Sequence, residues 1–258
     1  MSTGLNDAVR VERDGALAIV TIDHPPANAI SRAVVAGLTQ ALSKAEADPA
    51  CRALILTGAG PKFFSAGADI TEFGSTGGDT IATGQGLTLA MERSRLPIVA
   101  AVNGIAFGGG CELTLACDVR IASSAARFGQ PEIKIGIIPG WGGTQRLPRL
   151  IGRTAAIELL LTGDPIDSAR ALELGLVSRV VEPEALPGAA RDIAARYATQ
   201  APLAVAATKR AIAEGLDRPL HDGLEAERRE FVGLFASEDA REGITAFLEK
   251  RTATWTGR

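Results

Sequence analysis

The sequence predicts an α/β protein in which strands and helices alternate as far as Val181 and only helices follow Pro183. Short apolar runs end at glycine or at Asn-Gly, as buried strands commonly do. The segments between them carry apolar residues at helical spacing. Because strands that are separated by helices pair in parallel through right-handed crossovers, we expect a largely parallel sheet covered by helices. An all-helical region should follow it.

The first half of the chain is expected to open with a β-hairpin. Val9–Glu12 and Leu17–Ile22 flank Asp14-Gly15 with alternating β-branched residues, a pattern typical of a hairpin. Apolar residues at helical spacing then predict a helix from 31 to 48. The later elements expected in this half are a strand Ala53–Thr57, a loop with a short helix Lys62–Gly78, a helix Thr80–Arg95 and a strand Ile98–Val102.

The second half begins with Gly108–Gly110, which is expected to open a helix that runs to Ala116. Gly175 should end a short helix, since glycine is the usual residue just past a helix C-terminus. The other elements expected here are a strand Val119–Ala122, a Gly- and Pro-rich stretch Phe128–Gly143, helices Arg153–Leu161 and Ser168–Leu174, a strand Val177–Val181, and helices Glu184–Thr199, Leu203–Glu214, Leu220–Phe235 and Asp239–Lys250.

The composition argues against several classes of function. The 258 residues carry a formal net charge of −3, which gives no electrostatic reason to expect nucleic acid or an anionic membrane as a partner. Three cysteines form no Cys-x-x-Cys pair and the two histidines, His24 and His221, lie far apart, so we expect no metal site. No apolar run approaches membrane-spanning length and no leader is evident, so we expect a cytoplasmic protein with reduced thiols.

Two glycine-containing segments resemble common motifs but have the wrong spacing. Gly58-Ala59-Gly60 follows a strand, as a dinucleotide-binding loop does, but Phe63 stands at the third glycine position and Pro61 lacks an N–H for a pyrophosphate. Phe63 also stands where a nucleophile elbow around Ser65 needs its first glycine. Cys111 has no histidine partner in the sequence, so we interpret it as a packing residue.

Two further segments each run from a strand through a loop of small residues towards a helix. They are 64–69, after the strand Ala53–Thr57, and 103–113, after the strand Ile98–Val102. Small residues let a ligand approach the backbone, and N–H groups at a helix N-terminus have no partner within the helix. Two such N–H groups that point at one atom would form an oxyanion hole. Taken alone, the glycine run Gly108–Gly110 favours a role in close packing over an oxyanion hole.

These two segments belong to a larger set of motifs that resembles the enoyl-CoA hydratase/isomerase, or crotonase, family. The set comprises Ser-Ala-Gly-Ala-Asp (65–69), Gly-Gly-Gly-Cys-Glu-Leu (108–113), Phe-Gly-Gln-Pro-Glu-Ile (128–133) and Ile-Pro-Gly-Trp-Gly-Gly-Thr-Gln-Arg-Leu (138–147). The motifs stand in the family's order and spacing. The resemblance implies the α/β crotonase (ClpP/crotonase-like) fold, with a spiral of ββα units and the active site in residues 1–200 and a helical trimerisation region in residues 201–258.

The resemblance also implies roles for four residues. Ala66 and Gly109 match the positions whose backbone N–H groups hold the thioester oxygen, and one such donor is typically worth about 2.7–4 kcal/mol to the transition state. Glu112 and Glu132 match the two catalytic glutamates, which in the usual family account orient a water, with Glu132 delivering a proton to Cα. The implied activity is an enoyl-CoA hydratase that adds water reversibly to a trans-2-enoyl-CoA, with no cofactor and no metal.

The other implied contacts concern coenzyme A and the acyl chain. Four residues match the family's CoA-binding segment: Lys62, Ala68, Asp69 and Ile70. Trp141 stands where relatives often carry a small residue, so we expect it to shorten or redirect the acyl pocket. Phe247 and Lys250 match a C-terminal helix that in relatives reaches the CoA of a neighbouring subunit, within a homotrimer or a dimer of trimers.

Several of these assignments have alternatives that the residues themselves leave open. Glu112 falls in a first helical turn and Glu132 follows a proline, and both positions suit ordinary helix starts. Lys62 also fits an exposed, solvated lysine, and the last helix fits a plain amphipathic one. A double-bond isomerase of the same family needs only one acid, and other acyl-CoA reactions of the family, such as C–C or C–halogen cleavage, use the same enolate. An RNA-binding protein of the same fold needs a basic stripe, whereas Lys209-Arg210 and Arg228-Arg229 are short and interleaved with acids.

Overall fold

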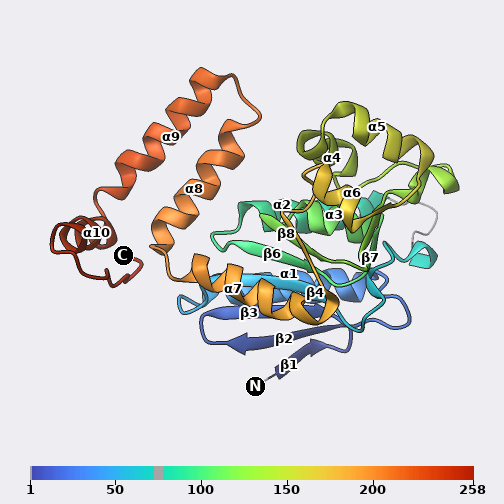
Figure 1. The fold of residues 1–258 in the computed structure, drawn as a ribbon, viewed down its shortest axis with the longest axis horizontal. Coiled ribbons are helices and arrows are strands. Elements are labelled where there is room, and N and C mark those ends of the chain that lie inside the picture. Colours follow the sequence, from blue (N-terminus) through green and yellow to red (C-terminus); the bar gives the residue numbers. More distant parts are fainter. Residues whose placement is uncertain (1, 73–77) are drawn as a thin grey trace.

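A seven-stranded mixed sheet forms the base of the molecule (Figure 1). The structure is a computed structural model that describes residues 2–72 and 78–258. In spatial order the strands are β1 (Ser2–Asn6), β2 (Val9–Asp14), β3 (Leu17–Ile22), β4 (Ala53–Gly58), β6 (Ile98–Val102), β8 (Val119–Ser123) and β11 (Arg179–Val181). The first three strands pair antiparallel, and the pairs from β3 to β11 are parallel.

The expected hairpin and parallel strands are confirmed. Val9 lies opposite Ile22, and the two-residue turn between β2 and β3 starts at Gly15, which has a φ of +57°. A positive φ costs glycine nothing, which explains its place in this turn. Strand β1 was not expected, because Ser2–Asn6 has little apolar or β-branched character.

A second sheet of four short strands was also not expected. Its spatial order is β10 (Ile166–Asp167), β9 (Arg127–Gly129), β7 (Ile105–Phe107) and β5 (Phe63–Ser65). Strands of two or three residues are too short for alternation to be recognised. Strands β5, β7 and β9 each follow a strand of the large sheet and precede a helix. The chain therefore repeats a strand–strand–helix unit, and the expected spiral of ββα units is confirmed.

The helices lie mostly where helical spacing placed them. In chain order they are α1 (Arg32–Ala47), the 3-10 helix η1 (Ile70–Glu72), α2 (Gly78–Arg93), α3 (Gly109–Leu115), the 3-10 helix η3 (Pro131–Ile135), α4 (Gly143–Ile151), α5 (Arg153–Thr162), α6 (Ser168–Glu173), the 3-10 helix η4 (Pro183–Ala185), α7 (Leu186–Ala198), α8 (Pro202–Gly215), α9 (Leu220–Leu234) and α10 (Glu238–Leu248). The short helix expected within Lys62–Gly78 is η1, and residues 73–77 of that expectation lie outside the described residues. Helix α4 was missed because it contains Pro148 and follows a run of glycines.

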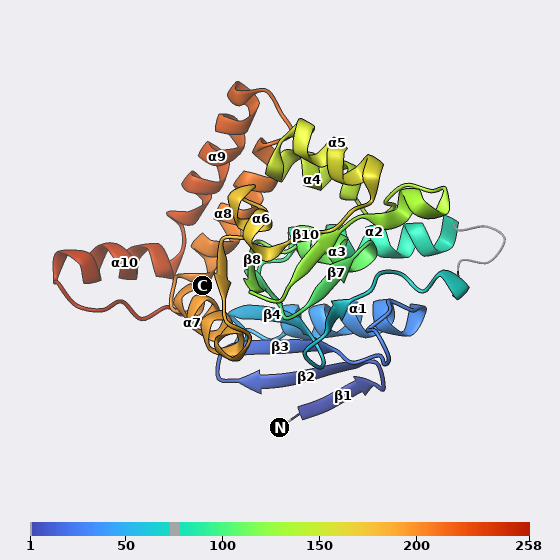
Figure 2. The ribbon, with the colours of Figure 1, turned by 45° about the vertical axis from the view of Figure 1, so that its right-hand side comes forward.

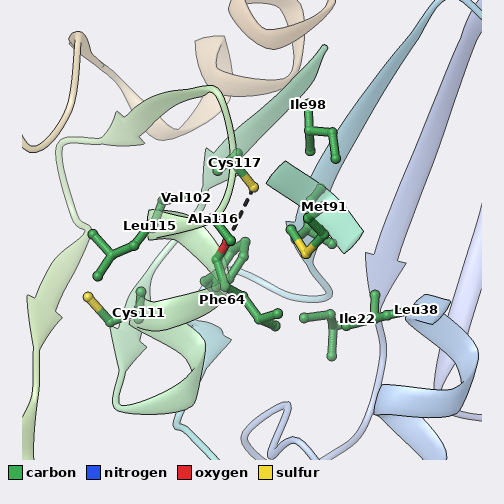
Figure 3. Packing of buried hydrophobic residues seen from close by; sticks show 14 of the residues in the cluster. Ile22, Leu38, Phe64, Met91, Ile98, Val102, Cys111, Leu115, Ala116 and Cys117 are labelled. Atoms are coloured by element: carbon green, nitrogen blue, oxygen red, sulfur yellow. Dashed lines mark hydrogen bonds between the residues drawn. The ribbon is translucent and has the colours of Figure 1, made fainter. Parts of the chain in front are cut away.

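The central strands β3, β4, β6 and β8 are buried on both faces, and alternate residues of these strands supply two cores. Leu54 and Leu56 of β4 pack with α1, α2 and α3, whereas Ala53 and Ile55 pack with α7 on the other face. Figure 3 shows part of the first core, in which Phe64 lies among aliphatic side chains. The loops that leave this sheet and enter the small sheet are thus anchored in well-packed core.

The C-terminal helices form an arm that projects from the sheets (Figures 1 and 2). Helices α8 and α9 pack antiparallel, and Gly215 and Gly223 allow the close approach: a Cβ on Gly215 would lie 3.4 Å from Gly223 Cα. At the base of the arm, Lys209 Nζ donates to Leu96 O (2.7 Å) and to Asp118 Oδ2 (2.6 Å). Within the described residues, no helix is long and apolar enough to cross a bilayer.

Candidate active site

A cavity of about 650 Å³ lies where the loops after β5 and β7 meet η3 and the loop before α4. Its described walls are mostly apolar, with two buried or half-buried carboxyl groups among them. The described lining residues are Ala66, Gly67, Ala68, Ile70, Ile81, Gly108, Gly109, Glu112, Pro131, Glu132, Lys134, Ile135, Gly136, Ile137, Ile138, Gly140 and Trp141. The structure therefore brings all four of the expected motifs to one cavity.

Glu112 points from α3 into this cavity and is almost fully buried, with 2% of its surface exposed. Its Oε1 accepts hydrogen bonds from the backbone N–H groups of Trp141 and Gly143, both at 2.7 Å. Burial raises the pKa of this carboxyl, while the two N–H groups and the charge of Arg146 act in the opposite direction. One carboxylate oxygen is thus held in place by the main chain, which fixes the orientation of the other.

Glu132 lines the same cavity from η3, with its Oε1 2.9 Å from where a Cβ on Gly108 would stand. Burial raises its pKa to about 7, and repulsion from Glu112 adds to the rise. The buried side chain of Gln130 contacts the same carboxyl. With the amide oriented so that its nitrogen faces Glu132, it donates to Oε1 at 3.1 Å and to Oε2 at 3.2 Å. This contact favours the ionised form and opposes the effect of burial.

The backbone amides near these acids differ from the expectation at one position. Ala66 N–H donates to Ala27 O at 3.0 Å, so it is not free to hold a ligand oxygen. Ala68 lies in a bridge with Ile30 in which the N–H of Asp69 and the carbonyl of Gly67 are the bonded groups. The Ala68 N–H therefore takes no part in the bridge and has no acceptor among the described residues.

Ala68 N is also the amide that lies beside Gly109, since it is 3.4 Å from where a Cβ on Gly109 would stand. Gly109 is the first residue of α3, so its own N–H has no carbonyl one turn earlier in the helix. The expectation for Ala66 is therefore corrected to Ala68. The expectation for Gly109 is retained. The motif identified the right segment, but only the long-range bond to Ala27 shows which of its amides is occupied.

The residues expected to contact coenzyme A fall into two groups. Ala68, Ile70 and Trp141 line the cavity, and Ile70 lies at its open side with 60% of its surface exposed. Lys62 and Asp69 do not line it. The ammonium group of Lys62 lies 5.2 Å from the centre of the Phe63 ring, and Asp69 accepts two hydrogen bonds from Thr71 at the start of η1.

Phe247 lies at the end of α10 and Lys250 just beyond it, and α10 lies far from α3 in both views (Figures 1 and 2). Phe247 is 83% exposed, and Lys250 is exposed. Neither lines the cavity. Their expected contact with the CoA of a neighbouring subunit thus stays a prediction.

Sequence reasoning missed two contributors to the site. Gln130 was part of a motif but was given no role, because its burial and its contact with Glu132 are seen only in the structure. The N–H of Gly143 was missed because its loop returns to Glu112 across 31 positions. Cys111, in contrast, behaves as expected, since burial raises the pKa of its thiol to about 12. Within residues 2–72 and 78–258, no three His, Cys, Asp or Glu side chains are grouped so as to hold a metal ion.

Comparison with known proteins finds similar chains over nearly the whole length. A family model described as enoyl-CoA hydratase/isomerase matches residues 12–258. The chain is 43% identical over 254 residues to a short-chain-enoyl-CoA hydratase of Clostridium acetobutylicum, covering 96% of each chain. It is 42% identical over 260 residues to a crotonyl-CoA hydratase of Syntrophomonas wolfei, covering 96% and 97%. A crystal structure of enoyl-CoA hydratase from Bacillus anthracis matches with a TM-score of 0.93 at 39% identity, over 97% of this chain and 100% of that one.

Proposed function

Because the chain belongs to the enoyl-CoA hydratase/isomerase family, we propose that it adds water reversibly across the double bond of a trans-2-enoyl-CoA. The product is a 3-hydroxyacyl-CoA. The observation that carries the proposal is the meeting of Glu112 and Glu132 with two small-residue backbone segments in one cavity. An isomerase needs one acid to move a proton, whereas hydration needs two groups to position and activate a water. Two similar relatives named as short-chain and crotonyl-CoA hydratases support a short substrate.

In this proposal the thioester oxygen accepts hydrogen bonds from the N–H groups of Ala68 and Gly109. Negative charge grows on that oxygen as the enolate forms, and fixed donors stabilise it without having to reorient. Removal of one such donor typically costs about 10²–10³-fold in rate. Main-chain donors suit this role because they are held by the bridge to Ile30 and by the start of α3.

The two carboxyl groups then divide the proton transfers. Glu112, whose Oε1 is held by two N–H groups, is the ionised partner that takes a proton from water as the water oxygen bonds to Cβ. Glu132 has a pKa of about 7 and so retains a proton near neutral pH. It delivers this proton to Cα, and the pair is restored when the two groups exchange a proton. General acid–base help of this kind contributes roughly 10²–10⁴-fold for each group.

The test is the hydration of crotonyl-CoA, followed by loss of the absorbance of the conjugated thioester. Glu112→Gln and Glu132→Gln should each lose roughly 10²–10⁴-fold in kcat/KM. Glutamine keeps the size of the side chain and can still accept the N–H groups that hold position 112. Glu158→Gln on the exposed face of α5 is the matched control and should keep full activity. A fully active Glu132→Gln enzyme would refute the proposed role of that residue.

An isomerase is the second candidate within the family. Assays with 3-enoyl-CoA beside 2-enoyl-CoA separate the two reactions. An isomerase converts 3-enoyl-CoA to 2-enoyl-CoA and adds no water to it, whereas a hydratase adds water to 2-enoyl-CoA. An RNA-binding role has less support. Its basic residues are paired with acids: Lys209 with Asp118, Arg210 with Glu230, Arg228 with Glu225, and Arg229 with Glu214. A salt-dependent gel shift of RNA at submicromolar protein concentration would support an RNA-binding role.

We also propose that the chain forms a homotrimer or a dimer of trimers through residues 201–258. Large apolar side chains are exposed along the arm and its end: Leu216, Leu220, Phe231, Val232, Phe235, Phe247 and Leu248. An apolar surface of this kind commonly marks a protein–protein contact. Sedimentation equilibrium tests the proposal, since a monomer at micromolar concentration would contradict it.

A further inference from the structure

We infer that the indole ring of Trp141 is the end wall of the acyl pocket and that it separates the pocket from a second cavity which a longer acyl chain could occupy. The inference rests on the proposed function, because it assumes an enoyl-CoA thioester in the first cavity. It adds a residue that sets chain length and a space that becomes available when that residue is reduced in size.

The position of the ring follows from the depth of the cavity. Its open side is marked by exposed isoleucines, with Ile138 68% and Ile135 58% exposed. Its buried end is marked by Glu112 and Trp141, which are 2% and 3% exposed. The bulky, charged coenzyme A has to lie at the open side, so the acyl chain beyond the reacting carbons points towards the buried end. There it meets Trp141.

The ring is fitted into the protein from both sides. On one side it approaches Gly109, where an added Cβ would lie 2.9 Å from Cζ3. On the other side it occupies the space that a side chain at Gly84 would fill, since an added Cβ there would overlap the indole. Glycine inside a helix such as α2 costs about 1 kcal/mol relative to alanine, so a glycine at this buried position indicates a specific packing need. Gly84 and Trp141 thus form a complementary pair.

Behind the ring lies a second cavity of about 350 Å³, between α2, α4 and the α8–α9 connection. Trp141 is the one described residue that lines both cavities. The charged groups of the second cavity satisfy one another: Arg146 pairs with Glu92 and Arg149 pairs with Asp217. An apolar chain that enters this space therefore does not have to break these ion pairs.

The main chain at position 141 is held by contacts that do not involve the indole. Its N–H donates to Glu112 Oε1 at 2.7 Å, and its carbonyl accepts from Arg146 Nη1 at 2.6 Å and from Thr88 Oγ1 at 3.2 Å. A smaller side chain at this position should therefore open the wall and leave the support of Glu112 in place.

The experiment compares kcat/KM for 2-octenoyl-CoA and crotonyl-CoA. The native enzyme should prefer crotonyl-CoA. Each further buried methylene is worth about four-fold, so four of them should raise the octenoyl-to-crotonyl ratio on the order of 10²-fold in Trp141→Ala. Trp141→Leu, a milder change, should raise it less. Trp255→Ala, on the C-terminal tail, is the control for loss of a tryptophan and should leave the ratio unchanged, because Trp255 lines neither cavity and its indole donates to Thr199 O.

Two additional variants test whether the second cavity receives the chain. Leu89 lines the second cavity but not the first, so Trp141→Ala combined with Leu89→Trp should cancel the gain for octenoyl-CoA. Gly84→Ala should lower stability in the native background, because it displaces the indole. It should be tolerated with Trp141→Ala, where the space is empty.

Binding gives a readout that does not depend on turnover. Calorimetry should show that Trp141→Ala gains affinity for octanoyl-CoA relative to butyryl-CoA, in the same direction as the change in kcat/KM. A native enzyme that hydrates no enoyl-CoA would overturn the proposed function. The enzyme could instead be active with the same octenoyl-to-crotonyl ratio of kcat/KM and the same octanoyl-to-butyryl ratio of affinity in the native, Trp141→Leu and Trp141→Ala forms. That result would overturn the role of Trp141 as the end wall but not the proposed function.

Discussion

Glu132→Gln should make the protein more stable at alkaline pH while it removes the activity. The carboxyl has a pKa of about 7 in the folded protein, against an ordinary value of 4.5. A group whose pKa is raised by folding favours the folded state below about pH 4.5, and this contribution is lost as the pH rises to about 7. Above pH 7 the folded protein has to hold an ionised carboxylate beside Glu112, whereas the amide of the variant carries no charge.

The expected size of the effect follows from the same two values. The full difference between them corresponds to about 3 kcal/mol. Glu132 is only partly buried and Gln130 donates to its carboxylate, so solvent and this contact reduce the effect to about 1–2 kcal/mol. For a chain of this size that predicts a rise in Tm of about 3–6 °C at pH 8.

The assay is thermal unfolding of the native protein and Glu132→Gln between pH 4.5 and pH 8, at one protein concentration. The two curves of Tm against pH should meet near pH 4.5 and separate up to about pH 7. Glu158→Gln, with the same change of charge on the surface, should stay within about 0.5 kcal/mol of the native protein throughout. Equal Tm values at pH 8, or a less stable Glu132→Gln, would show that the carboxyl is not strained by burial.

Two further predictions concern positions next to the site and at the base of the arm. Gln130→Met removes the amide that favours ionised Glu132, so the pKa of this carboxyl should rise. The decline of kcat/KM for hydration on the alkaline side, expected near pH 7, should then move up by roughly one pH unit. Stopped assays across pH 5–9 measure this shift. An unshifted decline would mean that Gln130 does not act through this carboxyl. Lys209→Met leaves the Asp118 carboxyl, whose pKa is already raised by burial, without its cation. Urea unfolding should show a loss of about 2 kcal/mol at pH 8 that shrinks towards pH 5, and a loss independent of pH would contradict this explanation.

The parts of the fold that could be predicted from the sequence are those with a long local pattern. Val34, Leu38 and Leu42 repeat at helical spacing, and α1 is found where they predict it. The strands β5, β7 and β9 have no such pattern, because each is only three residues long. Their pairing depends on neighbours that are about 20 to 40 positions away. The resemblance to a family supplied the spiral arrangement that local patterns could not.

The candidate site shows the same limit at the level of single atoms. Glu112 and Glu132 were identified from motifs in register, and both line the cavity. The choice between Ala66 and Ala68 could not be made in this way, since it depends on the hydrogen bond from Ala66 N–H to Ala27 O. The support of Glu112 by the loop around Trp141 is likewise a long-range contact. Motifs identify which segments meet, and the backbone bonds decide which groups remain available.

Two ion pairs of unequal exposure join the arm formed by α8 and α9 to the body. At its base Lys209 and Asp118 form a pair that is mostly shielded from water, with 11% and 29% of their side chains exposed. Towards its tip the contact is between Asp217 and Arg149, whose side chains are 66% and 58% exposed, and such pairs contribute about 0–1 kcal/mol. The ion pair at the base of the arm is therefore better shielded from water than the one towards its tip. Since Arg149 belongs to α4, the helix that follows the Trp141 loop, this weaker ion pair joins the arm to the element next to the cavity.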